Sequence, residues 1–525
     1  MLTVTYSAAL FGIDAFMIAI ECDGLRELPD FKIVGLPDLA VKEAEMRVMT
    51  AIRSSGIDLP DMSITVNLAP ADRKKEGSAL DLGIFAAICR CGSAIPRIDL
   101  SDKCFIGELS FTGEVRPVRG VLSMAIAAAE NGKREIFVPA ANLKEASAAA
   151  GNGVLIYGVR GGAELISHLR EESLITPISE PPEYLDAESV RLLGDFSEIK
   201  GQSRARRAVE IAASGGHNIL LIGPPGSGKS MISKRIPTIL PSLTYDEAVI
   251  TTRIHSAAGI LDGRCGLVPC RPFRAPHHSL STAALVGGGR SPMPGEISLA
   301  HGGVLFLDEF PEFAKNALEA LRAPLEDGEV TITRAAGRVT FPARFMMVCA
   351  MNPCRCGYFG SRRGKCTCTK SDVKNYLSKL SGPMLDRIDI QVEMPELDFS
   401  ELSDTKPAES SAVIRARVEA AREASRLRFK AAGYPDWKLR NNAMMGTEDI
   451  RRDCVLDDGC AALMETAFRN MNLSARAYDR ILRVARTVAD VSHAAEGGDP
   501  AAPSPIEKRH IMEAIQMRSL DKYWK

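Results

Sequence analysis

Lys229 and Ser230 close the stretch GPPGSGKS, which occupies residues 223–230 and has the clearest chemistry in the chain. An apolar run at residues 219–222 precedes it, and an amphipathic helix is expected from Lys229 onward. Because small residues let successive backbone N–H groups turn inward, such a loop can cradle a triphosphate at the positive end of the helix dipole. We therefore predict a nucleotide-binding loop made of Gly223, Pro224, Pro225, Gly226, Ser227, Gly228, Lys229 and Ser230.

Within this loop, Lys229 is expected to neutralise the β- and γ-phosphates, and the Ser230 hydroxyl to take a coordination position on Mg²⁺. A second apolar run, residues 304–307, ends in Asp308 and Glu309. Since ligands bind at the carboxyl ends of parallel strands, Asp308 is placed to hold the Mg²⁺ shell and Glu309 to orient or deprotonate the attacking water. The alternative is an acidic strand end that faces solvent.

Two further polar residues stand beside predicted strands. Asn352 ends the apolar run RFMMVCAMN, where an amide can polarise the water beside the γ-phosphate or simply form a turn. Arg387 precedes a strand in SGPMLDRIDI, at a place where ring-forming ATPases use an arginine on the γ-phosphate of a neighbour. An intramolecular salt bridge of Arg387 with Asp386 or Asp389 is an equally good interpretation.

Four cysteines form two C-x-C pairs around a basic, Gly-containing loop. They are Cys354, Cys356, Cys366 and Cys368. Four thiolates are the right number for a closed tetrahedral Zn²⁺ site, and free thiols are the alternative.

The composition is that of a large protein without a dominant charge. Its 525 residues, 46% hydrophobic and 25% charged, predict on the order of three domains. No run approaches the roughly 18 apolar residues of a membrane span, and the N-terminus lacks a basic segment, so we expect a cytoplasmic protein without signal or anchor. With 65 basic against 66 acidic residues, a DNA-binding surface would have to be local. The 13 cysteines are expected to be mostly reduced.

The chain divides into four segments by pattern. Residues 1–168 alternate short β-like runs with helical stretches, as in a mixed α/β domain, and residues 169–194 form an acidic, proline-containing linker. Residues 195–398 hold the phosphate loop, the acidic strand end and the cysteine pairs. Residues 399–525 are helical in pattern, with ESSAVIRARVEAAREASRLRFKAAG as a helical linker before the all-helical C-terminal part. Within the core, residues 245–301 do not fit a regular helix, and VTITRAAGRVTF predicts a hairpin.

Two strings in the first segment resemble the proteolytic domain of Lon-type proteases, whose fold is that of a ribosomal S5-like module. They are VNLAPADRKKEGSALDLGIFAA and GELSFTGEVRPVRGVLSMAIAAAENGKREIFVPAANLKEA. Lon peptidases need a Ser nucleophile beside an activating Lys. Here Ser78 falls one place early, Ala79 stands at the position of the nucleophile and Leu122 at that of the Lys. We therefore expect a non-catalytic Lon-like domain.

The motifs in order resemble the magnesium-chelatase-like branch of the AAA+ ATPases, of the ComM/YifB type. They are GPPGSGKS, VLFLDEF, LRAPLEDGEVTITR, CAMNPC, SGPMLDRIDI and LSARAYDRILRVARTVAD. The resemblance implies an α/β fold, with an AAA+ P-loop ATPase core and a helical C-terminal lid after the α/β Lon/S5-like domain. In this family Lys229, Ser230, Asp308 and Glu309 match the Walker A and B residues, Asn352 the first sensor, Arg387 the arginine finger and Arg476 the second sensor.

The resemblance also implies ATP and Mg²⁺ as ligands, a homo-hexameric ring, and a DNA helicase that promotes branch migration during DNA uptake. Loops facing the pore would pull on a strand through cationic groups. Candidates are the hairpin with Arg334 and Arg338, the cysteine loop with Arg362 and Arg363, and the His277–His278 insertion, each of which could equally be a surface feature. The alternatives are a metal-insertion motor subunit of the magnesium-chelatase type and a protein-remodelling AAA+ chaperone.

Overall fold

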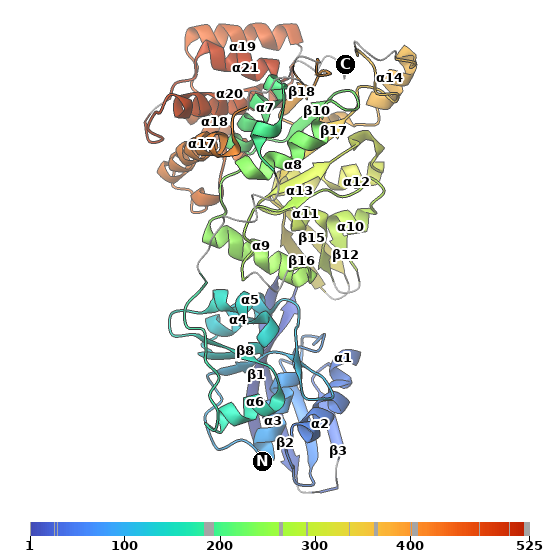
Figure 1. Ribbon diagram of the computed structural model, residues 1–525, viewed down its shortest axis with the longest axis vertical. Helices are drawn as coiled ribbons and strands as arrows, with labels where there is room; N and C mark the ends of the chain where they lie inside the picture. The colour runs from blue at the N-terminus through green and yellow to red at the C-terminus, as the bar shows by residue number, and fades with distance from the viewer. Residues whose placement is uncertain are drawn as a thin grey trace.

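The computed structural model describes residues 2–518 except residues 26, 29, 183–193, 262–265, 290–291, 335–336, 362–365, 399–400, 402–407, 472 and 503. The molecule is elongated, with the N-terminal α/β region at one end, the C-terminal helices at the other and the nucleotide core between them (Figure 1). Across the described ranges, no helix combines the length and the apolar character that crossing a bilayer demands.

The N-terminal region contains two main sheets around a buried helix. Strands β1 (Leu2–Phe11), β2 (Asp14–Leu25), β4 (Ser63–Ala69) and β3 (Asp30–Val34) form one sheet in that order, in which only β3 and β4 are parallel. Strands β5 (Lys103–Phe105), β8 (Glu135–Pro139) and β9 (Leu155–Val159) form a parallel sheet. Helix α3 (Asp81–Cys91) is apolar nearly all round, so it packs inside against β1 and β2. The other elements are α1 (Leu39–Lys42), α2 (Ala44–Ser54), β6 (Glu108–Leu109), β7 (Val115–Arg116), α4 (Val121–Glu130), α5 (Leu143–Ala146) and α6 (Gly162–Leu169).

Five parallel strands form the sheet of the nucleotide core, in the order β11-β14-β17-β10-β18. Their bounds are β10 (Ile219–Ile222), β11 (Phe273–Arg274), β14 (Val304–Leu307), β17 (Met346–Met351) and β18 (Ile390–Glu393). Strands β10, β14 and β17 are buried along their whole length, as expected for a parallel sheet covered on both faces. All five carboxyl ends therefore meet at one edge of the sheet and all amino ends at the other.

Helices cover both faces of this sheet. Helices α7 (Ser203–Gly215) and α8 (Lys229–Ile239) share an apolar cluster with one face, and α9 (Tyr245–Ala258) joins the cluster on the other. Helix α9 contradicts the expectation that residues 245–301 hold no regular helix. Thr244 Oγ1 accepts the backbone N–H of Glu247, and the Glu247 carboxylate accepts that of Thr244, which is the capping box that the letters TYDE encode.

Short elements complete the core. They are α10 (Thr282–Val286), β12 (Gly287–Gly288), β13 (Met293–Pro294), α11 (Glu296–Leu299), α12 (Lys315–Ala320), α13 (Arg322–Asp327), β15 (Glu329–Arg334), β16 (Gly337–Pro342), α14 (Lys370–Leu377) and α15 (Gly382–Leu385). Strands β15 and β16 pair antiparallel, so the predicted hairpin is present.

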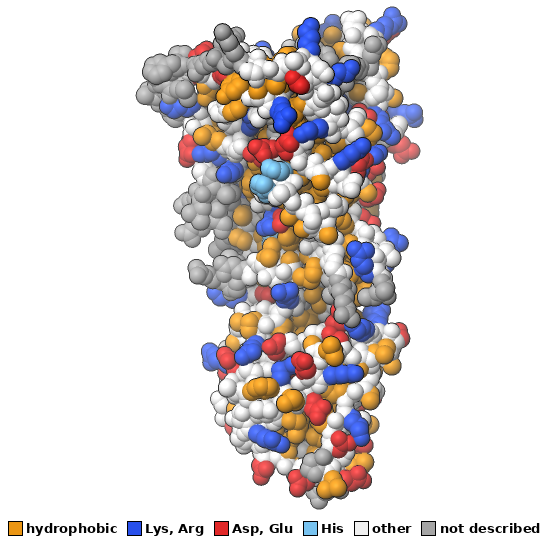
Figure 2. Space-filling view, turned by 90° about the vertical axis from the view of Figure 1, so that its right-hand side faces the viewer, with side chains coloured by type: hydrophobic (Ala, Val, Ile, Leu, Met, Phe, Trp, Pro, Cys, Tyr) orange, Lys and Arg blue, Asp and Glu red, His pale blue; other side chains and the backbone are white. Residues whose placement is uncertain are grey.

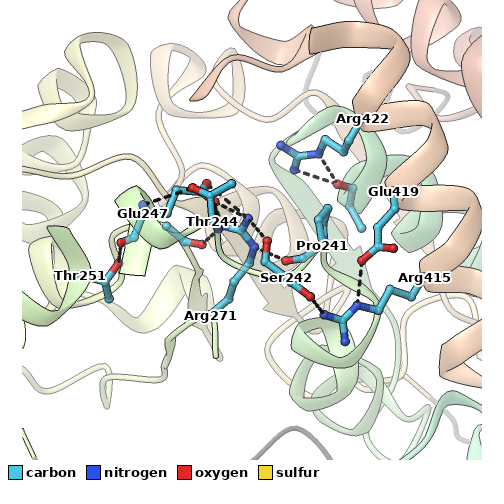
Figure 3. Close-up of polar contacts among 11 residues, drawn as sticks. Pro241, Ser242, Thr244, Glu247, Thr251, Arg271, Arg415, Glu419 and Arg422 are labelled. Atoms are coloured by element: carbon cyan, nitrogen blue, oxygen red, sulfur yellow. Dashed lines mark hydrogen bonds and ion pairs between the residues drawn. The ribbon is translucent and has the colours of Figure 1, made fainter. Parts of the chain in front are cut away.

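The C-terminal helices are α17 (Ser411–Ala431), α18 (Thr447–Asp453), α19 (Asp458–Met471), α20 (Ala475–Ala495) and α21 (Lys508–Gln516). Helix α17, expected as a linker, packs on α7, α8 and α20. Polar contacts add to this packing: Arg422 donates to the carbonyl oxygen of Ala213 at 2.8 Å, and Arg415 donates to Ser242 Oγ (Figure 3). Helix α17 is thus a structural part of the junction between the core and the C-terminal helices.

The N-terminal region docks on the core through α4, which contacts α9. Leu122, at the position where a Lon peptidase has its Lys, is fully buried in a cluster with Leu243, Ala248 and Leu267 of the core. Ser78 donates its hydroxyl to the Glu108 carboxylate. The position that peptidase chemistry would need therefore serves packing between two regions of the molecule.

Candidate active site

The phosphate loop lies at the carboxyl edge of the core sheet, between β10 and α8. Gly228 is the N-cap of α8 and has a φ of +90°, a left-handed conformation that favours glycine. Gly223 is required for a different reason, because a Cβ there would lie 2.4 Å from the carbonyl oxygen of Met394. The first and last glycines of the motif are thus both explained by backbone geometry.

Lys229 is only 8% exposed. Its Nζ donates to the carbonyl oxygens of Gly223 at 2.6 Å and Pro224 at 2.9 Å, and lies 3.3 Å from Oδ1 of Asn352. Burial lowers the pKa of Lys229 to about 8, since the charged form loses hydration there. A phosphate group would offset that loss, so the ammonium suits a polyphosphate ligand.

Ser230 and Asp308 come from different elements, the start of α8 and the end of β14, and their Oγ and Oδ2 atoms lie 2.8 Å apart. Mg²⁺ is bound by hard oxygen ligands, typically one or two carboxylates together with waters and substrate phosphates. The hydroxyl and the carboxylate therefore fit Mg²⁺ beside the phosphate loop. Asp308 Oδ1 also accepts the backbone N–H of Glu309 at 2.9 Å, which fixes the start of the following turn.

Glu309 has an unusual backbone and a partner distant in the sequence. Its φ of +50° is left-handed, which is uncommon for a residue with a side chain. Its Oε2 lies 3.0 Å from Nδ1 of His278. From the sequence, His277–His278 is a candidate for DNA contact, and the pairing of His278 with Glu309 is not predicted. It depends on β11 lying beside β14, and a two-residue strand gives little sequence signal.

The cysteine cluster adjoins the same edge, because Asn352 directly follows β17 and Cys354 comes two residues later. The sulfurs of Cys354, Cys356 and Cys366 lie 3.3, 3.6 and 3.8 Å apart, and with Cys368 all four lie within 4.8 Å of one another. A tetrahedral ion with Zn–S bonds of about 2.3 Å spaces its sulfurs by about 3.8 Å, so the four thiols fit a metal ion.

Arg387 lies at the opposite, amino edge of the sheet. Its carbonyl oxygen accepts from Asn218 Nδ2 at 2.9 Å, and Asn218 precedes β10, whereas the phosphate loop follows β10. The Arg387 guanidinium donates to the carbonyl oxygen of Pro383 at 2.6 Å and forms an ion pair with Glu326. An intramolecular ion pair is therefore present, but its partner differs from the two expected aspartates.

Those aspartates face another arginine. Arg480 of α20 lies 3.9 Å from an oxygen of Asp386 and 3.4 Å from one of Asp389. Asp389 is further stabilised as an anion, since its buried carboxylate has its pKa lowered by His217 and nearby arginines. The aspartates thereby join the C-terminal helices to the amino edge of the sheet.

Arg387 and Arg476 line one cavity of about 960 Å³ between the amino edge and the C-terminal helices. Arg476, near the start of α20, is exposed and makes no hydrogen bond or ion pair with any residue that the structure describes. Other arginines on the walls are Arg271, Arg344, Arg422, Arg440, Arg480 and Arg483. The two arginines expected near phosphates thus share a cavity on the far side from the phosphate loop of their own chain.

Arg334 and Arg338 are exposed and flank the tip of the hairpin β15–β16. The smaller hairpin β12–β13 is its neighbour, since a Cβ on Gly288 would lie 3.5 Å from a guanidinium nitrogen of Arg334. Arg362 and Arg363 lie outside the described residues. On the face in Figure 2, acidic and basic side chains are interspersed, so a cationic contact on this face would be local.

Three models of one family match the chain. They are described as "Magnesium chelatase, subunit ChlI" over residues 195–402, "Subunit ChlI of Mg-chelatase" over residues 20–142, and "Magnesium chelatase, subunit ChlI C-terminal" over residues 408–518. The first matches the part of the chain that holds both edges of the core sheet.

Relatives with similar sequences cover nearly the whole chain. The uncharacterized protein YifB of Escherichia coli is 40% identical over 525 residues, and the competence protein ComM of Haemophilus influenzae is 39% identical over 526 residues; each alignment covers 99% of this chain and 98% of the relative. Lon protease 2 of Bacillus subtilis is 30% identical over 186 residues, which are 33% of this chain and 32% of that protein. The chain therefore belongs to the magnesium-chelatase-like family of AAA+ ATPases, of the ComM/YifB type.

Proposed function

We propose that the chain is an ATP-driven, ring-forming motor that acts on DNA, as a branch-migration helicase in DNA uptake or recombination. One observation carries the proposal: the residues suited to ATP lie at the carboxyl edge of the core sheet, and Arg387 and Arg476 line a cavity at its amino edge. One chain then cannot complete its own catalytic site, whereas neighbouring chains can complete one another's.

In the proposed reaction, Lys229 binds the β- and γ-phosphates of ATP. Ser230 and Asp308 would hold Mg²⁺, which neutralises charge on those phosphates when bound. Glu309 orients the attacking water and accepts its proton, and Asn352 polarises the same water. The 3.3 Å between Asn352 and the Lys229 ammonium supports this role, because both groups then act at the terminal phosphate.

Arg387 then acts as an arginine finger, and Arg476 as a second sensor, on the nucleotide of a neighbouring chain. A cation supplied in trans stabilises the charge that develops in the transition state. Contacts of this kind are head-to-tail, so they close into a ring when the rotation between subunits permits it, and the family resemblance implies six subunits. Each turnover is thereby coupled to relative motion of neighbours.

DNA as the substrate is supported by a relative and by the hairpins. The relative in H. influenzae is named a competence protein, which supports a role of this chain in DNA uptake. The hairpin β15–β16, which lies next to the hairpin β12–β13, presents Arg334 and Arg338 to solvent, where they can contact a phosphate backbone.

Labelled forked and four-way DNA junctions, incubated with the full chain, ATP and Mg²⁺, test this function. We expect strand movement that requires hydrolysis, and an ATPase that DNA stimulates. The double variant Arg334→Ala/Arg338→Ala should keep its basal ATPase and lose most strand movement. The matched control is Arg451→Ala, which removes an exposed arginine from α18. Absence of strand movement together with an ATPase insensitive to DNA would contradict the proposal.

The same ATPase assay distinguishes two alternative functions. The descriptions of the family models favour a metal-insertion motor, whose turnover would respond to a separate chelatase subunit and not to DNA. The similarity to Lon protease 2 favours a protein-remodelling machine, whose turnover would respond to an unfolded polypeptide.

We also propose that Cys354, Cys356, Cys366 and Cys368 hold a structural Zn²⁺. The sulfur separations support this assignment. The cysteine loop packs on the phosphate loop, because a Cβ on Gly357 would lie 2.8 Å from Cδ of Pro225. A metal in the cysteine cluster would therefore also affect the nucleotide site. The metal would then fix the position of Asn352 relative to the phosphate loop.

Metal analysis of the purified protein tests the zinc assignment. We expect one zinc ion per chain, its loss in Cys354→Ser, and a lower thermal midpoint after chelation. Cys270→Ser changes a cysteine outside the cluster and should keep its zinc. A zinc-free wild type with an unchanged thermal midpoint after chelation would show that the thiols are free.

A further inference from the structure

Phe11 is an exposed aromatic side chain at the point where the N-terminal region meets the hairpin β15–β16. It is the last residue of β1 and is 41% exposed. A Cβ on Gly337 of β16 would lie 3.1 Å from Cζ of Phe11, so the ring lies against this hairpin. Figure 1 shows the hairpin at the end of the core that faces the N-terminal region.

The ring meets the hairpin beside both of its exposed arginines. Gly337 pairs with Arg334 across the hairpin, and Arg338 is the next residue of β16. Proteins that bind single-stranded nucleic acid combine cations along the phosphate backbone with aromatic rings on which the bases stack. Phe11, Arg334 and Arg338 bring these two kinds of group together, although they come from two regions of the chain.

The turn that carries Phe11 is fixed on the core by other residues. Gly12 has a left-handed φ of +69°, and a Cβ there would lie 2.3 Å from Cγ1 of Val339 in β16. Ile13 is buried in the same apolar cluster as Val339. Its carbonyl oxygen accepts from the Arg253 guanidinium at 3.0 Å. These contacts hold the turn in place independently of the Phe11 ring, so docking of the two regions does not explain why the ring is exposed there.

The charges around Phe11 suit a polyanion. Asp14 pairs with Phe11 across the β1–β2 hairpin, and its carboxylate is neutralised by Arg253, 2.6 Å away. Phe16, two residues after Asp14 and on the same face, has the guanidinium of the exposed Arg73 5.1 Å from its ring centroid. Positive charge beside exposed rings favours a nucleic-acid strand over an apolar partner.

We propose that Phe11 is a base-stacking residue for single-stranded DNA, in one composite site with Arg334 and Arg338, which contact the phosphates. This inference rests on the proposed action on DNA and gives the Lon-like region a part in holding the strand. Stacking on Phe11 is tolerant of sequence, because every base has a π face. A motor that moves along DNA of any sequence needs contacts of this kind.

Equilibrium binding of a fluorescently labelled thymidine oligonucleotide, with a non-hydrolysable ATP analogue and Mg²⁺, tests the inference. Phe11→Leu keeps an apolar side chain without a ring and should weaken binding about 10-fold, because one base–aromatic stack is lost. Phe11→Tyr keeps the ring and should stay within about twofold of the wild type. Phe111→Leu changes another exposed phenylalanine of the N-terminal region and is the matched control, which should bind as the wild type does. Wild-type affinity in Phe11→Leu would overturn the inference.

An abasic oligonucleotide separates stacking from a structural effect, since it keeps the phosphates and has no bases. Wild type and Phe11→Leu should bind it equally, whereas Arg334→Ala/Arg338→Ala should bind it more weakly. The dependence of affinity on salt should be unchanged in Phe11→Leu and shallower in the double arginine variant, because only the latter loses phosphate contacts. An equal loss by Phe11→Leu on both oligonucleotides would mean that Phe11 merely supports the hairpin.

Phe11→Trp gives a direct optical signal of stacking. A base stacked on the indole ring quenches its emission, so the thymidine oligonucleotide should lower the emission of this variant more than that of the wild type, which has two tryptophans of its own. Equal changes in the two proteins, although the oligonucleotide binds, would overturn the inference. A wild type that binds no oligonucleotide would overturn the proposed action on DNA instead, so the two failures are distinguishable.

Discussion

The two edges of the core sheet differ in how completely their charged groups are paired. At the carboxyl edge, Lys229 contacts carbonyl oxygens and Asn352, and Ser230 contacts Asp308. At the amino edge, Arg476 faces a cavity of about 960 Å³ without a partner among the described residues. A cation left unpaired on a cavity wall indicates a site for an anion from outside its own chain. The comparison therefore supports two half-sites on one protomer.

Loss of Arg387 at the amino edge should have the largest effect on ATP turnover. Arg387→Ala should lower the ATPase kcat about 10³-fold, because the charge that develops on the γ-phosphate loses its counter-charge, while ATP binding persists. Equilibrium binding of a fluorescent ATP analogue together with steady-state kcat measures both. Impaired binding with an unchanged kcat would place Arg387 outside the transition state.

Mixing experiments sharpen the same comparison. By the proposed roles, a Lys229→Ala chain lacks the group that binds ATP but still offers Arg387 to its neighbour, and an Arg387→Ala chain has the reverse defect. We therefore expect a mixture of the two to hydrolyse ATP clearly faster than either alone. A chain that carries both substitutions is the control. It should stay inactive, because every subunit of its ring has both defects. Failure of the mixture to recover, although the two chains form joint rings, would mean that each site is complete within one chain.

Loss of the carboxylate at the carboxyl edge should have the next largest effect. Glu309→Gln should bind ATP with the wild-type affinity and lower kcat about 10²-fold or more, because an amide cannot accept the proton of the attacking water. Binding of labelled ATP and release of phosphate measure the two steps. A variant that turns over normally would show that the water is activated by another group.

The parts of the site that follow a strand without interruption can be predicted from the sequence. Residues 223–230, Asp308 and Asn352 each come directly after an apolar run, and the α/β fold with its helical C-terminal region is confirmed. A strand fixes the place where its carboxyl end emerges, so local pattern suffices there. Helix α9 also had a local signal in its capping box, which the glycines and prolines further along the segment obscured.

The contacts between distant segments cannot be read from local pattern. The pairs His278–Glu309 and Arg387–Glu326 join residues 31 and 61 positions apart, and each depends on which elements become neighbours. Leu122 is a related case, since the sequence shows that it cannot serve as the Lys of a peptidase but not that it packs on Leu243. Such contacts are properties of the tertiary structure, and no single segment encodes them.

The smallest expected effect concerns how Arg387 is held within its own chain. Its guanidinium pairs with Glu326, whose side chain is 58% exposed, and an arginine that serves a neighbour must give up at least part of this contact. An exposed ion pair contributes up to about 1 kcal/mol, so Glu326→Gln should raise kcat by about twofold to fivefold at low salt. The increase should fade at high salt, because mobile ions screen the pair in the wild type as well. Glu329→Gln, which changes another exposed acidic residue on the same cavity wall, should leave kcat unchanged. A lower kcat in Glu326→Gln would mean that Glu326 orients Arg387 toward the neighbouring site, and the amino edge would then be preorganised by its own chain in the same way as the carboxyl edge.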